Sequence, residues 1–251
     1  MKQTKIYIYG KHAVTEALAH APKAVTKVYV DTRTVEKSVQ SLISKAGVPT
    51  GPLALGQARS DMVRGTAHQG LMASISLHEL LVPYSTFVEK LEPHKETMLV
   101  LLSGVEDPHN VGAIIRSAAG FGAVAVLIPT KHQAQVSGAV VKSSAGMALR
   151  IPLVPVESPE ETLRDLKKRG FSVYGFAGGS GQPLMKETFS APAVFVFGNE
   201  ALGLPKPIRA LCSSTLSIPL NPRCESLNVA AAAAAALFAW SSQNPEALAR
   251  S

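Results

Sequence analysis

The sequence predicts an α/β protein whose larger, carboxyl-terminal part is a mostly parallel β-sheet with helices on both faces. From Met98 onward, apolar strands, glycine-containing turns and helical stretches alternate, which is typical of a parallel sheet. The run MLVLLSGV at 98–105 is almost continuously apolar, as expected for a strand buried on both faces. Between residues 6 and 75, shorter strands alternate with helical stretches, so a smaller domain precedes the large sheet.

In the smaller region we expect helices at 13–21 and 35–47 and strands at 25–31 and 71–76. The second helix places Val35, Val39, Leu42 and Ile43 on one face and stops at Gly47. That spacing is typical of an amphipathic helix with a glycine at its end.

A boundary is expected between the two regions, where Pro83 and Pro93 stand in a stretch of mixed charge. Prolines in such a segment favour an interdomain connection. We therefore expect a first domain at 1–79, a linker with one short helix at 80–96, and a second domain at 97–251.

The second domain is expected to repeat strand, turn and helix. Its predicted strands are 98–105, 123–129, 171–177, 193–198 and 214–220, and its predicted helices are 112–119, 137–149, 159–169 and 226–240.

Charge is unevenly distributed along the chain. The formal net charge is +7 and the sequence pI is about 9.5. Residues 1–80 hold ten Lys and Arg against five Asp and Glu, so most of the surplus lies in the first domain. Such a surplus suits a polyanion such as RNA, although an ordinary solvated surface explains charge alone equally well.

Several classes of protein lack support in the sequence. Cys212 and Cys224 fit neither a zinc knuckle nor a redox pair, and the seven histidines form no H-x-x-x-H pair, so we expect no metal. The start, MKQTKIYIYGKHAV, has no apolar signal core, and the longest apolar run, 229–240, is shorter than the ~20 residues of a membrane span. We expect a cytoplasmic protein.

The first motif is GVEDPHNVGAIIRSAAGFGA at 104–123, which follows a buried strand and opens a helix. Asn110 and Gly112 are expected at the turn, with Arg116 about one helical turn beyond. Ligands of open α/β sheets gather at the carboxyl ends of strands, and helix starts attract anions. Arginine adds a fork of donors suited to phosphate, so this segment favours a ligand site over a plain surface helix.

The second motif is AVFVFGNEALGLP at 193–205. Gly198 and Gly203 have the spacing of a P-loop, but Leu204 and Pro205 replace its Lys-Ser/Thr, which excludes one. Gly198 would let a ligand approach the backbone. Glu200 is either an acceptor for a substrate or a solvated turn residue, and the spacing favours neither.

The third motif is LSIPLNPRCESLNVAAAAAAALF at 216–238. Ser226 is a plausible N-cap of the alanine-rich helix, and Asn228, in the first turn, could orient a loop or a ribose. No serine stands in G-x-S-x-G, so hydrolase chemistry has no support.

In this order and spacing, the three motifs resemble the SpoU (TrmH-like) family of RNA 2′-O-ribose methyltransferases. The resemblance covers the whole chain, because YGKHAVTEAL at 9–18 and HQGLMA at 68–73 look like the L30e-like RNA-binding domain of many members. It implies an α/β sheet whose carboxyl-terminal part forms a trefoil knot, a homodimer, and S-adenosylmethionine as cofactor. The layout most resembles the type that acts on a guanosine of 23S ribosomal RNA.

The resemblance also implies roles for particular residues. The polar motif positions, taken as catalytic, are Asn110, Arg116, Glu200, Ser226 and Asn228. The positions taken as cofactor-binding are Gly198, Ile218 and Leu227, with Ala177, Phe197, Asn199 and Leu220 nearby.

Family proposals make the arginine, here Arg116, the general base. A guanidinium keeps its proton far above neutral pH, so we expect Arg116 instead to hold the adjacent phosphate and stabilise the developing alkoxide. A phosphate oxygen is one candidate acceptor for the proton.

Alternatives remain at this point. Within the methyltransferases, the target could be tRNA or an antibiotic-resistance site in rRNA. A non-catalytic RNA-binding or ribosome-assembly protein would not need Asn110, Arg116, Glu200 and Asn228. A nucleotide-dependent oxidoreductase would need a glycine fingerprint that is missing.

Overall fold

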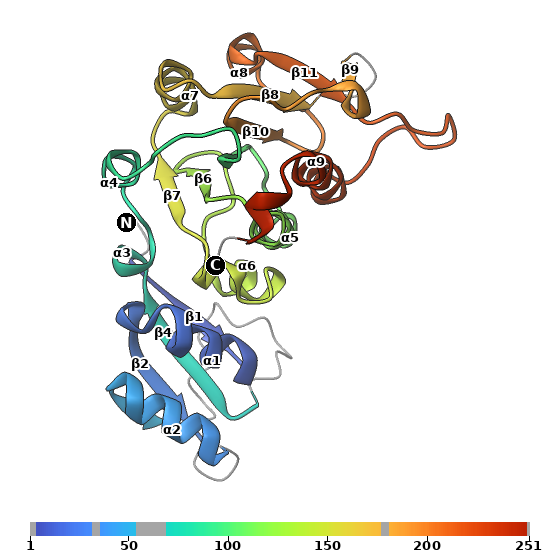
Figure 1. Cartoon of the computed structure of the whole chain (residues 1–251). Helices are drawn as coiled ribbons and strands as arrows, with labels where there is room; N and C mark the ends of the chain where they lie inside the picture. Colours follow the sequence, from blue (N-terminus) through green and yellow to red (C-terminus); the bar gives the residue numbers. More distant parts are fainter. Residues whose placement is uncertain (1–3, 32–35, 54–68, 177–180, 250–251) are drawn as a thin grey trace.

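The computed structural model describes residues 4–31, 36–53, 69–176 and 181–249 and contains two sheets (Figure 1). A four-stranded sheet of order β1-β4-β2-β3 belongs to the amino-terminal part, and a seven-stranded sheet of order β7-β6-β5-β10-β8-β11-β9 belongs to the rest. The smaller sheet with α1 and α2 lies below the larger one in Figure 1.

The smaller region contains the helices and strands that the sequence predicted. Its elements are β1 (Lys5–Tyr9), α1 (Lys11–His20), η1 (Pro22–Ala24), β2 (Val25–Val30), α2 (Lys37–Ala46), β3 (Thr50–Pro52) and β4 (Leu71–Ser76). Ile6 and Ile8 of β1 are buried and alternate with more exposed residues, as expected of a strand with one face on a core. Gly47 ends α2 with a φ of 64°, a left-handed conformation that glycine adopts without steric cost. His68 of the HQGLMA motif lies outside the described residues.

The connection between the two regions is packed against the second domain. Within 80–96 it forms one short helix, α4 (Tyr84–Glu89), as expected, and another short helix, α3 (Leu77–Leu80), precedes it. The Val82 amide donates to the Leu153 carbonyl at 3.0 Å. This bond attaches the linker to β7 at the edge of the large sheet, and Pro83 is the N-cap of α4.

The second domain consists of a parallel sheet and its crossing helices. Its elements are β5 (Met98–Ser103), α5 (Pro108–Gly120), β6 (Ala125–Pro129), α6 (Gly138–Ser143), η2 (Met147–Leu149), β7 (Leu153–Val156), α7 (Pro159–Lys168), β8 (Ser172–Phe176), β9 (Gln182–Pro183), η3 (Leu184–Lys186), β10 (Ala193–Gly198), α8 (Lys206–Leu211), β11 (Ser214–Ser217), α9 (Val229–Gln243) and η4 (Pro245–Ala249). Every described pairing in this sheet is parallel.

Helices cover both faces of the large sheet, as predicted. Leu99 and Leu101 of β5 share a core cluster with α7 and α8, whereas Val100 and Leu102 share one with α5 and α9. Successive side chains of a strand point to opposite faces, so the continuous apolar run is explained by burial on both sides.

Some predicted helices begin or end differently in the structure. The first motif helix begins at Pro108 instead of residue 112, because the Asp107 carboxylate accepts from the His109 amide at 2.8 Å and proline suits the first helical position. Asn110 and Gly112 therefore lie in the helix and not at a turn. The helix predicted at 137–149 is interrupted after Ser143, where Gly146 has a φ of 83°.

The carboxyl-terminal segment runs to the far side of β8 and then returns to α5. After β10 the chain passes through α8 to β11, which pairs on the far side of β8. The alanine-rich α9 then returns to pack against α5 and β10. This return brings the residues after β11 back to the motif helix.

The linker is tied to α7 through one carboxylate. Tyr84 donates its hydroxyl hydrogen to Asp165 Oδ2 at 2.7 Å, and Arg169 Nε donates to the same oxygen at 2.8 Å. Burial opposes ionisation of Asp165, but the bonds from Tyr84 and Arg169 outweigh it and lower the pKa of the carboxyl.

We expect Tyr84→Phe to lower the free energy of unfolding by about 1 kcal/mol at neutral pH. A carboxylate with a lowered pKa stabilises the fold above its ordinary pKa, and that contribution disappears as the pH falls through about 4 toward the lowered value. Urea unfolding at several pH values measures both effects. Tyr29→Phe is the control, because its hydroxyl bonds to no described residue; an equal loss in both variants would contradict the assignment.

Candidate active site

The three motifs meet at one edge of the large sheet. The first follows β5, the second follows β10, and the third lies between β11 and α9. β5 and β10 are hydrogen-bonded neighbours in parallel register, with Ser103 opposite Gly198. The carboxyl ends of these strands therefore place the first two motif loops side by side, and the return of α9 brings the third to them.

A chain of hydrogen bonds joins all three motifs. Asn110 donates from Nδ2 to Glu200 Oε1 at 2.8 Å, and Asn228 donates from Nδ2 to Asn110 Oδ1 at 2.9 Å. These residues are 90 and 118 positions apart in the chain. Asn110 is thus the link between the second motif and the third.

The donor and acceptor properties of the side chains fix the direction of this network. An ionised carboxylate only accepts hydrogen bonds, so Asn110 must turn its amino group toward Glu200. Its carbonyl oxygen then faces Asn228, which must present its own amino group. The remaining oxygen of Asn228 accepts from the amides of Ala230 and Ala231 at 2.8 and 3.4 Å.

Asn228 is therefore the N-cap of α9. The expectation that Ser226 caps this helix is wrong, because α9 begins at Val229 and the side chain of Asn228 makes the capping bonds. Asparagine and serine are about equally good caps, so the sequence did not distinguish them. Ser226 lies exposed in the loop before the helix.

The second motif forms a closed turn. The backbones of Asn199 and Gly203 exchange hydrogen bonds of 3.1 and 2.9 Å. A Cβ at Gly198 would lie 2.5 Å from the Gly203 carbonyl oxygen. Glycine is needed at 198 for this backbone contact, whether or not a ligand also approaches there. Glu200 is exposed at this edge of the sheet, and its carboxylate accepts the hydrogen bond from Asn110.

Two side-chain amides hold the first loop, and one of them was not foreseen. Gln133, which is 8% exposed, accepts from the amides of Gly104 and Val105 at 3.1 and 2.9 Å and donates to the Val105 carbonyl at 2.6 Å. Asn199 donates from Nδ2 to the Gly104 carbonyl at 2.9 Å. A lone glutamine after β6 carries no motif signal, and only its burial identifies it.

Arg116 is not part of the network. It lies six positions after Asn110, which at ~100° per residue places the two side chains about 120° apart around α5. Arg116 is exposed, and its guanidinium makes no hydrogen bond or ion pair with any residue that the structure describes. It lies two turns from the start of the helix, one turn further than predicted, and is free to contact an anion from solvent.

The residues predicted to contact a cofactor are mostly apolar or backbone positions at this edge. Phe197 is buried and stacks on Phe176 at 5.2 Å between ring centroids. Ile218 packs partly on the core, whereas Leu220 and Leu227 are 37% and 38% exposed. Ala177 lies outside the described residues.

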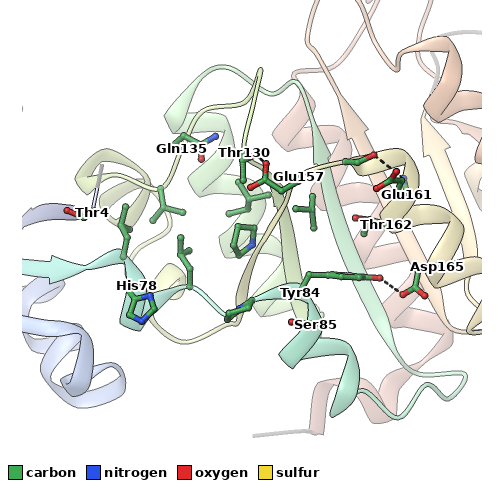
Figure 2. Close-up of a pocket in the computed structure, with 18 residues that line it drawn as sticks. Thr4, His78, Tyr84, Ser85, Thr130, Gln135, Glu157, Glu161, Thr162 and Asp165 are labelled. Atoms are coloured by element: carbon green, nitrogen blue, oxygen red, sulfur yellow. Dashed lines mark hydrogen bonds between the residues drawn. The ribbon is translucent and has the colours of Figure 1, made fainter. Parts of the chain in front are cut away.

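A cavity of about 1020 Å³ lies away from the motif edge (Figure 2). It is formed by the linker, the ends of β6 and β7 and the start of α7, and it contains none of the predicted site residues. Apart from His78, its titratable side chains are Tyr84 and three acidic residues, Glu157, Glu161 and Asp165. Because carboxylates repel a phosphate backbone, we assign the functional site to the motif edge and not to this cavity.

A parallel sheet with three polar loops joined at the carboxyl ends of its strands defines an α/β enzyme with its ligand site at that edge. Among solved structures, the SpoU methyltransferase AviRb from Streptomyces viridochromogenes with AdoMet aligns with a TM-score of 0.81 at 24% identity, over 97% of this chain and 92% of that chain. A putative RNA methyltransferase of the TrmH family from Porphyromonas gingivalis aligns with a TM-score of 0.72 at 27% identity, over 94% and 89%.

Comparison of sequences also points to RNA methyltransferases. The model of the SpoU rRNA methylase family matches residues 97–238, and the model for RNA 2′-O ribose methyltransferase substrate binding matches residues 7–81. A relative from Nitrosomonas europaea, a 23S rRNA (guanosine-2′-O-)-methyltransferase RlmB, is 34% identical over 92% of this chain and 89% of its own length. A relative of the same name from Pseudomonas syringae pv. tomato is 35% identical over 92% and 93%.

The chain belongs to the SpoU family of RNA 2′-O-ribose methyltransferases, which use S-adenosylmethionine as methyl donor. The predicted family and fold class are confirmed. The exposed side chains of Leu220 and Leu227 offer apolar cover of the kind that an adenosine needs. No cluster of metal-ligating side chains occurs in the described part of the chain, and no helix there could span a membrane.

We expect Asn110→Ala to weaken binding of S-adenosylhomocysteine by about tenfold, because loops that are no longer held together must be ordered on binding. Isothermal titration calorimetry measures this affinity. Asn244→Ala is the matched control, since that buried amide donates to the Trp240 carbonyl at the far end of α9. Equal affinity in the two variants would contradict a role for the network in forming the site.

Proposed function

We propose that this enzyme methylates the ribose 2′-hydroxyl of a guanosine in 23S ribosomal RNA, in the cytoplasm, with S-adenosylmethionine as donor. The observation that carries the proposal is the joining of all three motifs through Asn110. It is supported by relatives named for this reaction that match almost the whole chain. Bound S-adenosylmethionine supplies an electrophilic methyl group on a sulfonium.

The cofactor site that we propose lies between the second and third motif loops. Backbone at Gly198, Ile218 and Leu227 would contact the cofactor, and Leu220 and Leu227 would cover its apolar parts. Phe197 and Asn199 would support the cofactor-binding loop without touching the cofactor through their side chains. Phe197 is buried, and the Asn199 side chain already bonds Gly104 and its own turn. Ala177 is proposed from the family resemblance alone.

The catalytic roles follow from geometry and charge. Arg116, exposed and unpaired among the described residues, would hold the phosphate beside the target ribose and stabilise the alkoxide as it forms. Glu200, Asn110 and Asn228 would orient the loops that position the ribose, and Ser226 would contribute from the same loop as Asn228. Alignment of this kind can account for several kcal/mol of barrier reduction, up to ~7–11 in well-oriented systems.

We propose a division into an RNA substrate-binding domain at 1–79, a linker at 80–96 and a methyltransferase domain at 97–251. The matched ranges, 7–81 and 97–238, support it. The surplus of basic residues in the first 80 positions suits contact with the phosphate backbone, which makes RNA binding sensitive to salt.

We also propose a homodimer. Phe238 of α9 is 60% exposed, lies against Phe121 with ring centroids 6.0 Å apart, and is followed by Leu248, which is 52% exposed. Large apolar side chains left exposed in this way favour a protein interface. A second copy seated there would lie against the end of α5, the helix that carries Arg116.

We expect Arg116→Ala to lower kcat more than ~100-fold, with affinity for S-adenosylhomocysteine within about twofold of the wild type, because removing a charge that acts mainly in the transition state affects turnover and not donor binding. Single-turnover kinetics and calorimetry separate the two. Arg209→Ala, on the opposite face of the sheet, is the control. Near-normal turnover in Arg116→Ala would refute the role.

Transfer of tritium from labelled S-adenosylmethionine tests the function itself. The enzyme should label 23S rRNA, and nuclease digestion should release the label as 2′-O-methylguanosine. Label in tRNA would indicate the alternative target, and label at another rRNA nucleoside would indicate a resistance-type enzyme. If no RNA were labelled, the proposed function would be wrong, and a non-catalytic RNA-binding role would be favoured instead.

A further inference from the structure

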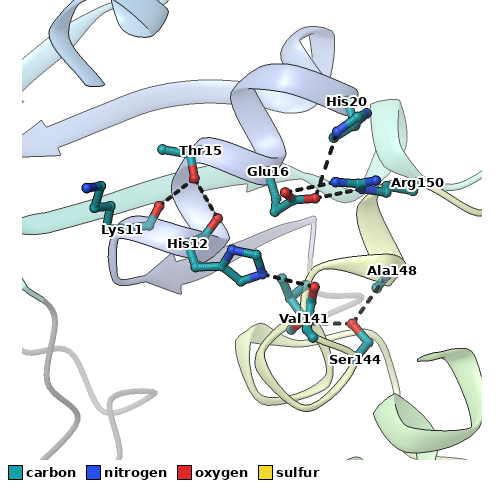
Figure 3. Close-up of polar contacts among 10 residues, drawn as sticks. Lys11, His12, Thr15, Glu16, His20, Val141, Ser144, Ala148 and Arg150 are labelled. Carbon is teal, nitrogen blue, oxygen red and sulfur yellow. Dashed lines mark hydrogen bonds and ion pairs between the residues drawn. The ribbon is translucent and has the colours of Figure 1, made fainter. Parts of the chain in front are cut away.

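The first domain contacts the second through a bidentate ion pair between Glu16 and Arg150 (Figure 3). Arg150 donates from Nε to Glu16 Oε2 at 2.7 Å and from Nη2 to Glu16 Oε1 at 2.9 Å. Glu16 belongs to α1 and Arg150 follows η2. The Glu16 side chain is only 13% exposed, and the hydrogen bonds from Arg150 lower the pKa of its carboxyl.

The surfaces around this pair fit each other at the backbone. A Cβ on Gly138 would lie 2.2 Å from the Tyr7 carbonyl oxygen, and one on Gly146 would lie 2.9 Å from Glu16 Cγ. His12 Nε2 lies 3.2 Å from the Ala145 carbonyl oxygen. The interface between the two domains needs glycine at 138 and 146, because any side chain there would clash with the first domain. The two surfaces are therefore closely packed.

The segment that receives the first domain also contacts the motif helix. Ser143 of α6 donates its hydroxyl hydrogen to the Pro108 carbonyl at 3.1 Å. A Cβ on Gly112 of α5 would lie 1.9 Å from Ser143 Oγ. Thus α6 lies between the first domain and α5, which carries Asn110 and Arg116.

We propose that Glu16 and Arg150 are positioning residues that hold the RNA-binding domain in one orientation relative to α5. The distance between the RNA contacts of the first domain and the ribose beside Arg116 is then fixed. RNA whose docking feature and target nucleotide lie at another spacing cannot occupy both sites at once. The inference rests on the proposed function, because it assigns the pair a role in selecting the RNA substrate.

Changes at this interface should affect binding of RNA and not binding of the methyl donor. Loosening the interface leaves the motif edge intact but lets the first domain sample other orientations. We therefore expect KM for RNA to rise, whereas kcat at saturating RNA and the affinity for S-adenosylhomocysteine stay near the wild-type values. A purely structural loss would also lower kcat and weaken the affinity for S-adenosylhomocysteine.

Charge reversal gives the sharpest test. Glu16→Arg and Arg150→Glu each place like charges at the interface and should raise KM for 23S rRNA by about five- to tenfold. The double variant Glu16→Arg/Arg150→Glu restores the pair with opposite polarity and should recover most of the loss. Small-angle X-ray scattering should show a larger radius of gyration in each single variant and the wild-type value in the double variant.

The control is Arg164→Glu, an exposed arginine on α7, which changes the net charge as Arg150→Glu does. If the single variants resembled this control in KM, or if the double variant failed to recover, the positioning role would be overturned. Thermal unfolding of each variant identifies any that fail to fold, in which case scattering and KM of the double variant decide. If the wild type methylated no RNA, the proposed function would fail instead.

Discussion

The site depends on the pair of hydrogen bonds that Asn110 makes to Glu200 and Asn228. Three segments distant in sequence each contribute one polar side chain, and asparagine at the centre can satisfy both neighbours because it is donor and acceptor at once. An aspartate there would set two carboxylates 2.8 Å apart, and an alanine would leave both partners without this bond. The requirement for an amide at 110 therefore follows from the chemistry of Glu200 on one side and of the α9 cap on the other.

The fold makes this meeting possible. Parallel pairing of β5 with β10 places the first two loops at the same edge, and packing of α9 on α5 returns the third loop to them. Gln133 and Asn199 then bind the turn at Gly104 from two sides. On the other flank, Ser143 of α6 bonds the start of α5, so the residue that joins the motifs stands on a helix held both at the sheet edge and by α6.

Much of this architecture could be predicted from the sequence. Continuous apolar runs predicted the buried strands, and the spacing at 35–47 predicted α2 and its glycine stop. The roles at Asn110, Glu200 and Asn228 came from the family resemblance, because spacing alone left Glu200 equally well explained as a solvated turn residue. The start of α5 was misplaced because Asp107-Pro108 was not recognised as a cap and first turn. Gln133 and the Glu16–Arg150 pair had no local signal, since their partners lie 28 to 134 residues away in the chain.

A crystal structure of the enzyme with S-adenosylhomocysteine tests the central claim most directly. We expect the ligand between the turn at Gly198 and the loop that leads to Asn228, with the bonds of Asn110 to Glu200 and Asn228 intact. Ligand bound in the cavity between the linker and α7, with the motif edge empty, would contradict the account.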